Sequence, residues 1–287
     1  MRKKSLVKML TCGAVAAGLI AALGLTACGG SPASSSASSN VELQVFAANS
    51  LSKAMDEAQE LYTQQTGVTF ADTQYKASGE LNEMLAAGSY ADLEITASKG
   101  TMDTAVEKGY VDESTRTDMF TNELVIVAKQ GSNLKDVTLA DIAAGKYSVC
   151  VGDDSVPAGN YAAQALSTVG AYEPPVKDAG KTGKDISGKE GSYVGITPIL
   201  QTSVGNVCKQ AENGDVDVAI VYSSDVYRFG GVEIVGIIPD DTHKVIVYPG
   251  AVCKDSKNAQ AANDFMQWCI TDPDAQKIFQ KWGFDLS

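Results

Sequence analysis

The chain has 287 residues, of which 35 are acidic and 23 basic, so its formal net charge is −12 at pH 7. Such an acidic surface argues against nucleic acid and anionic lipid headgroups as partners, and any anionic ligand must be held by local groups because the overall field repels it. A single histidine and the absence of a Cys-x-x-Cys pair weigh against a zinc site.

The N-terminus has the layout of a secretory signal. A basic head is followed by an apolar run over 9–27 that, taken alone, also has the length of a short membrane span. The run ends in Leu-Thr-Ala-Cys, which resembles the bacterial lipobox, in which the cysteine is acylated and becomes the first residue. We therefore predict a signal peptide over 1–27, lipid on Cys28 and a flexible Gly/Ser/Ala tether over 28–40. The predicted product is exported and held by lipid at the outer face of the cell membrane.

Four further cysteines remain once Cys12 leaves with the signal and Cys28 takes lipid, namely Cys150, Cys208, Cys253 and Cys269. An exported protein meets oxidising conditions, and four cysteines allow three pairings that the sequence does not rank. Four free, buried thiols are the alternative.

Beyond the tether, strand-like and helix-like segments alternate. Runs rich in β-formers lie at 41–48, 68–75, 91–98, 122–129, 147–153, 217–223 and 232–238. Helical periods lie at 51–65, 79–87, 100–108, 158–169, 198–212, 258–270 and 273–282. This alternation predicts an α/β fold with parallel sheets and helices on both faces.

Two long strand-like runs are suited to carry the chain between two lobes, which a chain of this length can form. One covers 122–130 and the other 243–253. They predict a first lobe of 41–125 plus 249–287 and a second lobe of 126–248.

Three of the predicted helices begin with small residues directly after a strand. Ser50 follows the first strand and is predicted to cap the helix that begins at residue 51. Ser78 opens a second helix, and Pro157 with Ala158 opens a third. In open α/β sheets ligands bind beyond the carboxyl ends of strands, and a helix start offers an anion unpaired N–H groups and the positive end of a dipole. The pattern predicts an anion site.

Short enzymatic motifs offer a competing interpretation. Ser50 and Lys53 form an S-x-x-K, residues 181–183 read K-T-G, and Ser224-Asp225 begins an S-D-N, a set typical of penicillin-recognising serine enzymes. In those enzymes K-T-G comes last and lies on a strand. Here it precedes Ser224 and sits in a Gly/Lys/Pro-rich segment predicted to be an exposed loop, so the order argues against the motif.

Two other signals are weaker. Residues 183–190 match G-x-x-x-x-G-K but place Glu190 where Ser or Thr binds magnesium. Asp153 and Asp154 form a pair that suits a cation or a protonated ligand, although a solvated loop is the interpretation we favour.

Taken in order, the segments resemble the extracytoplasmic molybdate-binding proteins of ABC transporters. The resemblance covers nearly all of 41–287 and rests on VFAANSLSKAM, ASGELNEMLAAGSYADLEITAS, NELVIVAK, VGDDSVPAGNYAAQAL, DVDVAIVYSSDV, PDDTHKVIVYPGAVC and FQKWGF. It implies a two-lobed, hinged periplasmic-binding-protein fold of type II with the ligand cleft between the lobes. It also implies no catalysis, no cofactor, no bound metal cation, a monomeric carrier and an ABC permease as partner.

The resemblance implies a site made of serine hydroxyls, backbone N–H groups and a tyrosine hydroxyl. Carried over position by position, it falls on Ser50, Ser78, Ala158, Val204 and Tyr222. Asn49 replaces a small residue of the family pattern and is expected to narrow the pocket or to donate a hydrogen bond. The segment 173–195 is longer than the pattern suggests.

The donor set suits molybdate, a fully ionised tetrahedral dianion that only accepts hydrogen bonds. Tungstate has nearly the same size, so the sequence does not separate the two. Phosphate near pH 7 still carries a proton and needs a carboxylate partner. We therefore expect high-affinity binding of molybdate or tungstate and delivery to a permease. Another tetrahedral oxyanion such as sulfate or thiosulfate is the alternative, and a penicillin-recognising serine enzyme the distant one.

Overall fold

The computed structural model describes residues 41–287. The predicted signal peptide, the lipid-bearing Cys28 and the tether over 28–40 lie outside the described residues. Among residues 41–287, no helix combines the length and the apolar character that a membrane span needs.

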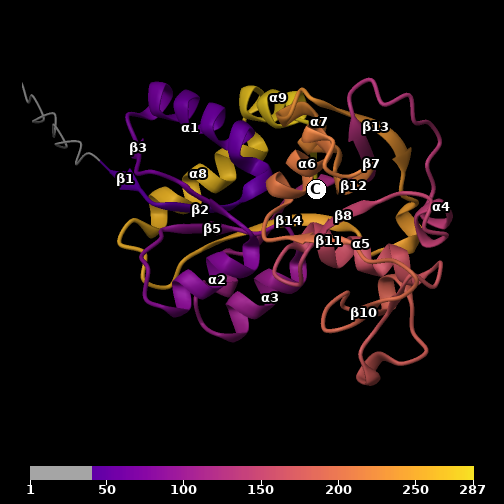
Figure 1. Cartoon of the computed structure of the whole chain (residues 1–287). Coiled ribbons are helices and arrows are strands. Elements are labelled where there is room, and N and C mark those ends of the chain that lie inside the picture. The colour runs from indigo at the N-terminus through magenta and orange to yellow at the C-terminus, as the bar shows by residue number, and fades with distance from the viewer. Residues whose placement is uncertain (1–40) are drawn as a thin grey trace, which may run out of the picture. The chain divides into compact units, whose positions relative to one another are not determined.

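The first sheet has six strands in the order β15-β6-β14-β5-β2-β4, of which β2, β5 and β14 are labelled in Figure 1. Its members are β2 (Val45–Ala48), β4 (Gln74–Lys76), β5 (Leu93–Ile95), β6 (Thr117–Asn122), β14 (Ile246–Val252) and β15 (Asp285–Leu286). Strand β2 pairs in parallel with β4 and β5, whereas β14 runs antiparallel to both β5 and β6. A separate parallel pair joins β1 (Glu42–Leu43) to β3 (Thr69–Phe70).

The second sheet has five strands in the order β11-β8-β12-β7-β13. They are β7 (Leu124–Lys129), β8 (Val149–Gly152), β11 (Ile199–Gln201), β12 (Val218–Tyr222) and β13 (Val232–Ile237). Strands β11, β8 and β12 are parallel, and β7 runs antiparallel to β12 and β13. A small antiparallel pair joins β9 (Tyr172–Glu173) to β10 (Ser192–Tyr193).

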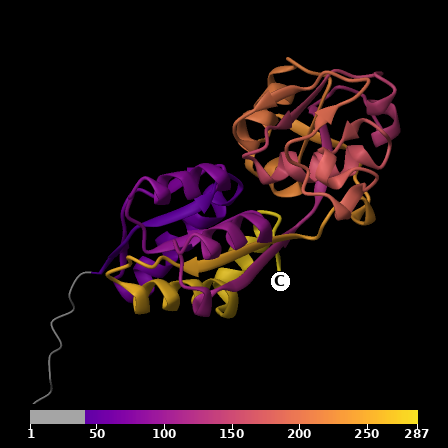
Figure 2. The same ribbon diagram turned by 90° about the horizontal axis from the view of Figure 1, so that it is seen from below.

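Both sheets are therefore mixed, and the prediction of parallel sheets was wrong in this respect. Strand β6 leads into β7 through the single residue Glu123, and β13 leads to β14 without an intervening α-helix. Both connections join one sheet to the other (Figure 2), so β7 and β14 each enter their sheet without a helical crossover within it. Each of these two strands runs antiparallel to both of its neighbours.

Within residues 41–287, seven helices follow the predicted periods, whereas α4 and α7 were not predicted. Those of the first sheet are α1 (Ser52–Thr66), α2 (Ser78–Ala86), α3 (Lys99–Glu107), α8 (Ala259–Thr271) and α9 (Pro273–Lys281). Those of the second are α4 (Leu139–Ala143), α5 (Pro157–Ser167), α6 (Val204–Asn213) and α7 (Ser223–Arg228). Helix α6 begins at Val204 and not at residue 198, because 199–201 form strand β11. Short 3₁₀ turns are η1 (Asn49–Leu51), η2 (Glu113–Thr115), η3 (Val176–Asp178), η4 (Gly183–Asp185) and η5 (Asp240–Thr242).

Local sequence accounts for most helix ends. Ser98 and Ser203 accept hydrogen bonds from the first turns of α3 and α6, which satisfies N–H groups that a helix start leaves unpaired. Pro157 occupies the first position of α5, where its fixed φ and missing N–H are no penalty. Gly67 ends α1 in the left-handed region, at φ 79°.

The core is built from small and branched residues against both sheets. Every residue of β12 and every residue of α5 is buried, so these two elements lie at the centre of the second sheet's packing. The four cysteines Cys150, Cys208, Cys253 and Cys269 are buried free thiols. The sequence left open either disulfide bonds or free thiols among these four cysteines, and the structure has free thiols.

Candidate functional site

One small cavity brings together all five residues that were predicted as site residues. Its lining includes Ser50, Ser78, Ala158, Val204 and Tyr222. The remaining lining residues are Ala48, Asn49, Lys76, Ala77, Ala97, Val156 and Pro157. The cavity has a volume of about 10 Å³, the scale of one water-sized sphere. Only a compact ligand fits there unless the walls separate.

The cavity lies where several helices begin. Helix α2 begins at Ser78, α5 at Pro157 and α6 at Val204, and each follows a strand or an extended residue. The first N–H groups of a helix have no intrahelical partner, and the aligned peptide dipoles place partial positive charge there. Helices α5 and α6 carry no acidic residue in the first turn that would oppose an anion. In α6 the N–H groups of Gly205 and Asn206 already donate to Asn49 and Ser203, which leaves that of Val204 as the candidate donor.

A close approach of backbone sets the position of α5. A side chain at Gly159 would place its Cβ 2.2 Å from the carbonyl oxygen of Gly152, the last residue of β8. Only glycine allows the first turn of α5 to pack this tightly against the end of the strand. The N–H of Ala158 is thereby held at the cavity wall.

Ser50 lines the cavity but does not cap the helix, so that part of the prediction was wrong. The N-cap of α1 is Leu51, which makes no side-chain cap bond, and Ser50 lies within η1. Its Oγ instead lies 2.9 Å from the hydroxyl of Tyr248, which also accepts from Asn122 Nδ2 at 3.3 Å. Because Tyr248 already accepts from Asn122, its proton can be donated to Ser50, which leaves the Ser50 proton for a ligand. Tyr248 and Asn122 were missed by sequence reasoning.

Ser78 is similarly free to donate. It is 1 % exposed, and its Oγ accepts a hydrogen bond from the Ala97 N–H at 3.0 Å. That bond uses a lone pair of the oxygen and leaves the hydroxyl proton available. The oxygen is thus fixed in position while its proton can point into the cavity.

Tyr222 supplies the clearest indication of a ligand. Its side chain is buried, at 1 % exposure, and within residues 41–287 its hydroxyl has no hydrogen-bond partner. Leaving a buried polar group unsatisfied costs about 1–3 kcal/mol. Burial, together with the nearby Tyr248 and Tyr161, holds the pKa of Tyr222 well above its usual value, so the group stays a neutral donor. A hydroxyl in this state is suited to donate to a bound acceptor.

Charged side chains contribute little to the cavity. Lys76 lines it, but its ammonium forms an exposed ion pair with Glu80 at 2.9 Å. Asp153 accepts from the N–H and hydroxyl of Ser155, and Asp154 accepts from the N–H of Glu190. Neither carboxylate lines the cavity, in agreement with the solvated-loop interpretation.

Asn49 links the two sheets across the cavity. Its Oδ1 accepts from the Gly205 N–H at 3.2 Å and from Arg228 Nη1 at 3.0 Å, and its backbone carbonyl also accepts from Arg228. A second link runs from the Gly79 N–H to the Ser155 carbonyl at 3.3 Å. Asn49 therefore narrows the cavity and acts as an acceptor rather than as the expected donor. Arg228, whose side chain is buried and paired with Asp225 at 2.5 Å, was missed by sequence reasoning.

The enzymatic motifs do not form a catalytic group. Lys53 is exposed while Ser50 pairs with Tyr248. Residues 181–182 of the K-T-G lie in a loop, and Gly183 begins the 3₁₀ turn η4 and not a strand. Among residues 41–287 no group of three or more His, Cys, Asp or Glu side chains is placed to hold a metal ion.

Residues 43–285 match the family model of bacterial extracellular solute-binding proteins, and the chain belongs to this family. It is 31 % identical to the molybdate-binding protein ModA of Escherichia coli (strain K12), over 85 % of this chain and 89 % of ModA. It is 28 % identical to the "Putative ABC transporter substrate-binding lipoprotein YvgL" of Bacillus subtilis (strain 168), over 93 % of this chain and 95 % of that protein.

A solved structure supports the fold. The "substrate binding domain of putative molybdenum ABC transporter from Clostridium difficile" superposes with a TM-score of 0.61 at 29 % identity, over 85 % of this chain and 98 % of that one. The expectation of a two-lobed periplasmic-binding-protein fold of type II is confirmed. As a solute-binding protein the chain is a transporter component and not an enzyme.

Proposed function

We propose that this protein binds molybdate, and tungstate with it, outside the cytoplasmic membrane and delivers the anion to an ABC transporter permease. The observation that carries the proposal is the buried hydroxyl of Tyr222, unpaired within residues 41–287, in a cavity whose lining also includes Ser50, Ser78 and the first residues of three helices. The similarity to ModA of Escherichia coli supports it.

The chemistry of the cavity matches a dianion that carries no proton. Molybdate only accepts hydrogen bonds, and each charge-assisted bond contributes about 1.5–3 kcal/mol. Five donors are proposed, from the hydroxyls of Ser50, Ser78 and Tyr222 and the N–H groups of Ala158 and Val204. Phosphate near neutral pH would need an acceptor, and none of these residues supplies a carboxylate.

Closure of two lobes would couple binding to delivery. In this proposal the first lobe comprises 41–125 plus 249–287 and carries Ser50 and Ser78, and the second comprises 126–248 and carries the other three. Ligand favours the closed state only if it makes contacts from both lobes, which this division provides. A permease that recognises the closed form would then receive loaded carrier selectively.

Lipid on Cys28 would keep the carrier at the membrane. The sequence before Cys28 and the lipoprotein named among the relatives support this assignment. Mass spectrometry of membrane-extracted protein should show an acylated cysteine, Cys28, as the first residue. A mature protein whose N-terminal residue carries no lipid would contradict the anchor.

The proposal is tested on the mature chain, residues 28–287 with Cys28→Ser. Ligand that binds only the native state raises the melting temperature, so molybdate and tungstate should raise it more than sulfate or phosphate. Calorimetry should show at least tenfold weaker molybdate binding for the double variant Ser50→Ala/Ser78→Ala. Unchanged affinity in that variant would count against the site.

Sulfate is the second candidate, because the small volume of the cavity favours the smaller dianion. Competition titrations separate the two anions. If sulfate displaces molybdate at comparable concentrations, the carrier is a general oxyanion binder, and if sulfate binds far more weakly, the cavity is sized for the larger ion.

A further inference from the structure

A second and much larger cleft adjoins the small cavity. Its volume is about 550 Å³. Pro157 lines both spaces, and the consecutive residues Ala97 and Ser98 line the small cavity and the larger cleft respectively. We call the small space the inner cavity and the larger one the outer cleft. The outer cleft is formed by the first turn of α3, one side of α5 and two segments near residues 188 and 245.

The outer cleft has a charge opposite to that of the protein. Its lining contains Lys99, Lys189 and Lys244 and no aspartate or glutamate, although acidic residues outnumber basic ones by 35 to 23 in the chain. Within residues 41–287, Lys189 and Lys244 form no ion pair, and Lys99 pairs with Asp118 at 2.6 Å. The three lysines come from three different segments, so it is the fold that brings them to the lining of one cleft.

The long segment 173–195 is anchored so that it contributes to this cleft. The N–H of Glu190 donates to Asp154 Oδ2 at 2.9 Å. Gly188 packs so closely on the carbonyl of Asn160 that an added Cβ would lie 2.1 Å from the oxygen. These contacts hold Lys189, which lies between the two residues, beside the first turns of α5.

Gln164 on α5 connects both lysine-bearing segments. Its Nε2 donates to the Ser187 carbonyl at 3.3 Å, and its Oε1 accepts from the Lys244 N–H at 2.9 Å. One buried amide, 2 % exposed, thus positions the backbone next to Lys189 and Lys244 together.

We propose that the outer cleft is an entry site that captures the oxyanion and passes it to the inner cavity. This inference rests on the proposed function and adds a second, weaker anion site made of Lys99, Lys189 and Lys244. A cleft with one sign of charge raises the local concentration of a counter-ion and increases association rates by about 10–10³-fold. The cleft is large enough for an anion that still holds its water, whereas the inner cavity is not.

The division of roles predicts a kinetic signature. Exposed ammonium groups attract through water and release readily, so they should set the association rate. The buried neutral donors should set the dissociation rate. Removing the three lysines should therefore slow binding without speeding release.

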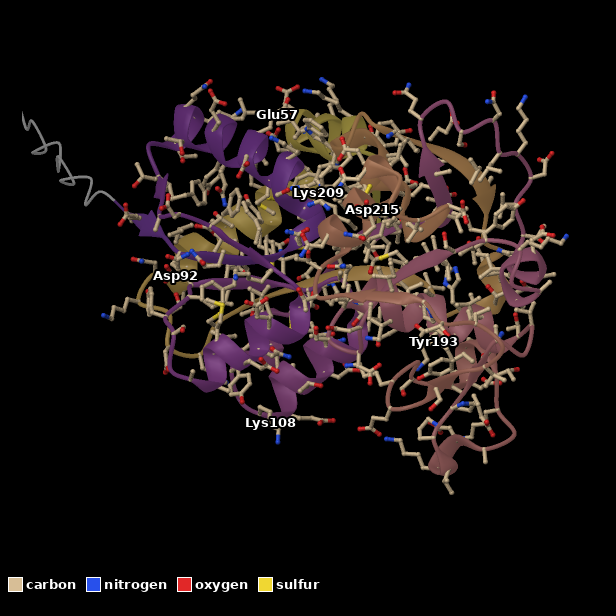
Figure 3. All side chains as sticks on the ribbon, viewed as in Figure 1. Glu57, Asp92, Lys108, Tyr193, Lys209 and Asp215 are labelled. Atoms are coloured by element: carbon tan, nitrogen blue, oxygen red, sulfur yellow. The ribbon has the colours of Figure 1, made fainter. Side chains whose placement is uncertain are left out.

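The test compares two triple variants of the mature chain by stopped-flow fluorescence with molybdate. The first is Lys99→Gln/Lys189→Gln/Lys244→Gln. The matched control is Lys108→Gln/Lys135→Gln/Lys209→Gln, which removes the same charge from exposed lysines that do not line the cleft. Two of these control positions, Lys108 after α3 and Lys209 on α6, are labelled in Figure 3.

At low ionic strength the cleft variant should associate about tenfold more slowly than wild type, with its dissociation rate changed less than twofold. The control should associate within twofold of wild type, and the difference between the variants should shrink as salt is added. If Lys189→Gln disturbs the loop, the double variant Lys99→Gln/Lys244→Gln, at two exposed positions, gives the same readout with a smaller change.

Equal slowing in both triple variants would show that only net charge matters and would overturn the proposal. An unchanged association rate in the cleft variant would do the same. Sulfate is run as a second probe. If wild type binds sulfate but not molybdate, the choice of ligand is wrong while the capture site is still tested, and if it binds neither anion, both proposals fail.

Discussion

The inner cavity and the outer cleft share α5 as a wall but differ in every physical property that governs anion binding. The inner cavity measures about 10 Å³ and offers hydroxyl and N–H donors, whereas the outer cleft measures about 550 Å³ and offers three lysines. The neutral hydroxyl and N–H donors lie in the inner cavity, where the ion must lose its water. The lysines lie in the outer cleft, where the ion can stay hydrated. The comparison suggests that affinity and association rate are set by different side chains.

The physical reason lies in the empty protein. A lysine inside the inner cavity would be a buried, unpaired charge whenever no anion is bound, and such a charge is strongly destabilising. A neutral hydroxyl in the same place destabilises the empty protein much less. The hydroxyl of Tyr222, which has no partner within residues 41–287, is an example of this smaller cost. Lysines in the roomy cleft remain hydrated and incur no comparable penalty.

The largest effect is expected from placing a charge in the inner cavity. Ser78→Asp keeps a residue that suits the first turn of α2 but adds a carboxylate beside the anion. Two unit charges 4 Å apart repel by about 4 kcal/mol at an effective dielectric of 20, so molybdate affinity should fall about 1000-fold or more. Ser78→Asn, which has nearly the same shape and no charge, should lose far less. Calorimetry on both variants checks this, and equal losses would mean that size and not charge governs the site.

A second large effect is expected in the pH dependence of the free energy of unfolding, while molybdate affinity should not follow the same pH dependence. Glu94 on β5 is fully buried, neither of its carboxyl oxygens has a partner within residues 41–287, and burial raises its pKa to about 8. Asp92, two residues earlier, is equally buried but accepts from the Gln44 N–H and from the Tyr90 and Ser256 hydroxyls. Glu94 should therefore favour its protonated form in the folded protein near neutral pH.

The sign follows from proton linkage. Between the ordinary glutamate pKa of 4.5 and the folded value of about 8, the folded state holds a proton that the unfolded state has released. The free energy of unfolding should therefore decrease as pH rises through this range. Glu94→Gln should remove that slope, by a few kcal/mol in total, in urea titrations at several pH values. Molybdate affinity should stay nearly constant over the same range, because no inner-cavity donor titrates there. An unchanged slope in Glu94→Gln would contradict the assignment.

Tyr222→Phe should change affinity and stability in opposite directions. Loss of one charge-assisted hydrogen bond of about 1.5–3 kcal/mol should weaken molybdate binding about 10- to 100-fold. The unliganded protein should be equally or more stable, because the variant removes a buried hydroxyl that has no partner. Calorimetry and urea unfolding of the same preparations check both signs. Tyr62→Phe, at a buried tyrosine of α1 that lines neither the inner cavity nor the outer cleft, is the matched control.

A smaller effect is expected from the link across the cavity. Asn49→Ala removes the acceptor of Gly205 and one acceptor of Arg228. If these bonds contribute to the closed state, molybdate should dissociate about fivefold faster, corresponding to about 1 kcal/mol, with little change in association rate. Asn206→Ala, at an exposed position of the first turn of α6, is the control, because it removes a side-chain amide of the same size that does not join the two sheets. Identical dissociation rates in both variants would mean that Asn49 does not contribute to closure.

The sequence predicted the site best where a local rule applies. Pro157 at the first position of α5 and Ser78 at the start of α2 follow from helix-start chemistry. Tyr222 followed only from the resemblance to a family, since a tyrosine at the end of a buried strand has no special local signature. That these residues bind the ligand stays a prediction until an anion is measured.

The features that the sequence did not reveal depend on long-range contacts. Ser50 was expected to cap a helix, but its partner Tyr248 lies 198 residues away. Arg228 and Asn49 are separated by 179 residues, and their contact depends on how the two sheets approach. Strands β6 and β14 were missed or treated only as connections, because strand–helix alternation does not reveal antiparallel neighbours. Local patterns determine where elements begin, whereas tertiary packing determines their partners.

The most direct test of the central claim is a crystal structure of the mature chain with molybdate, in which anomalous scattering locates the molybdenum atom. The account predicts one anion in the inner cavity, within hydrogen-bond distance of the hydroxyls of Ser50, Ser78 and Tyr222 and of the N–H groups of Ala158 and Val204. An anion that is held tightly by lysine or arginine, or an inner cavity filled by protein side chains while molybdate binds elsewhere, would contradict it.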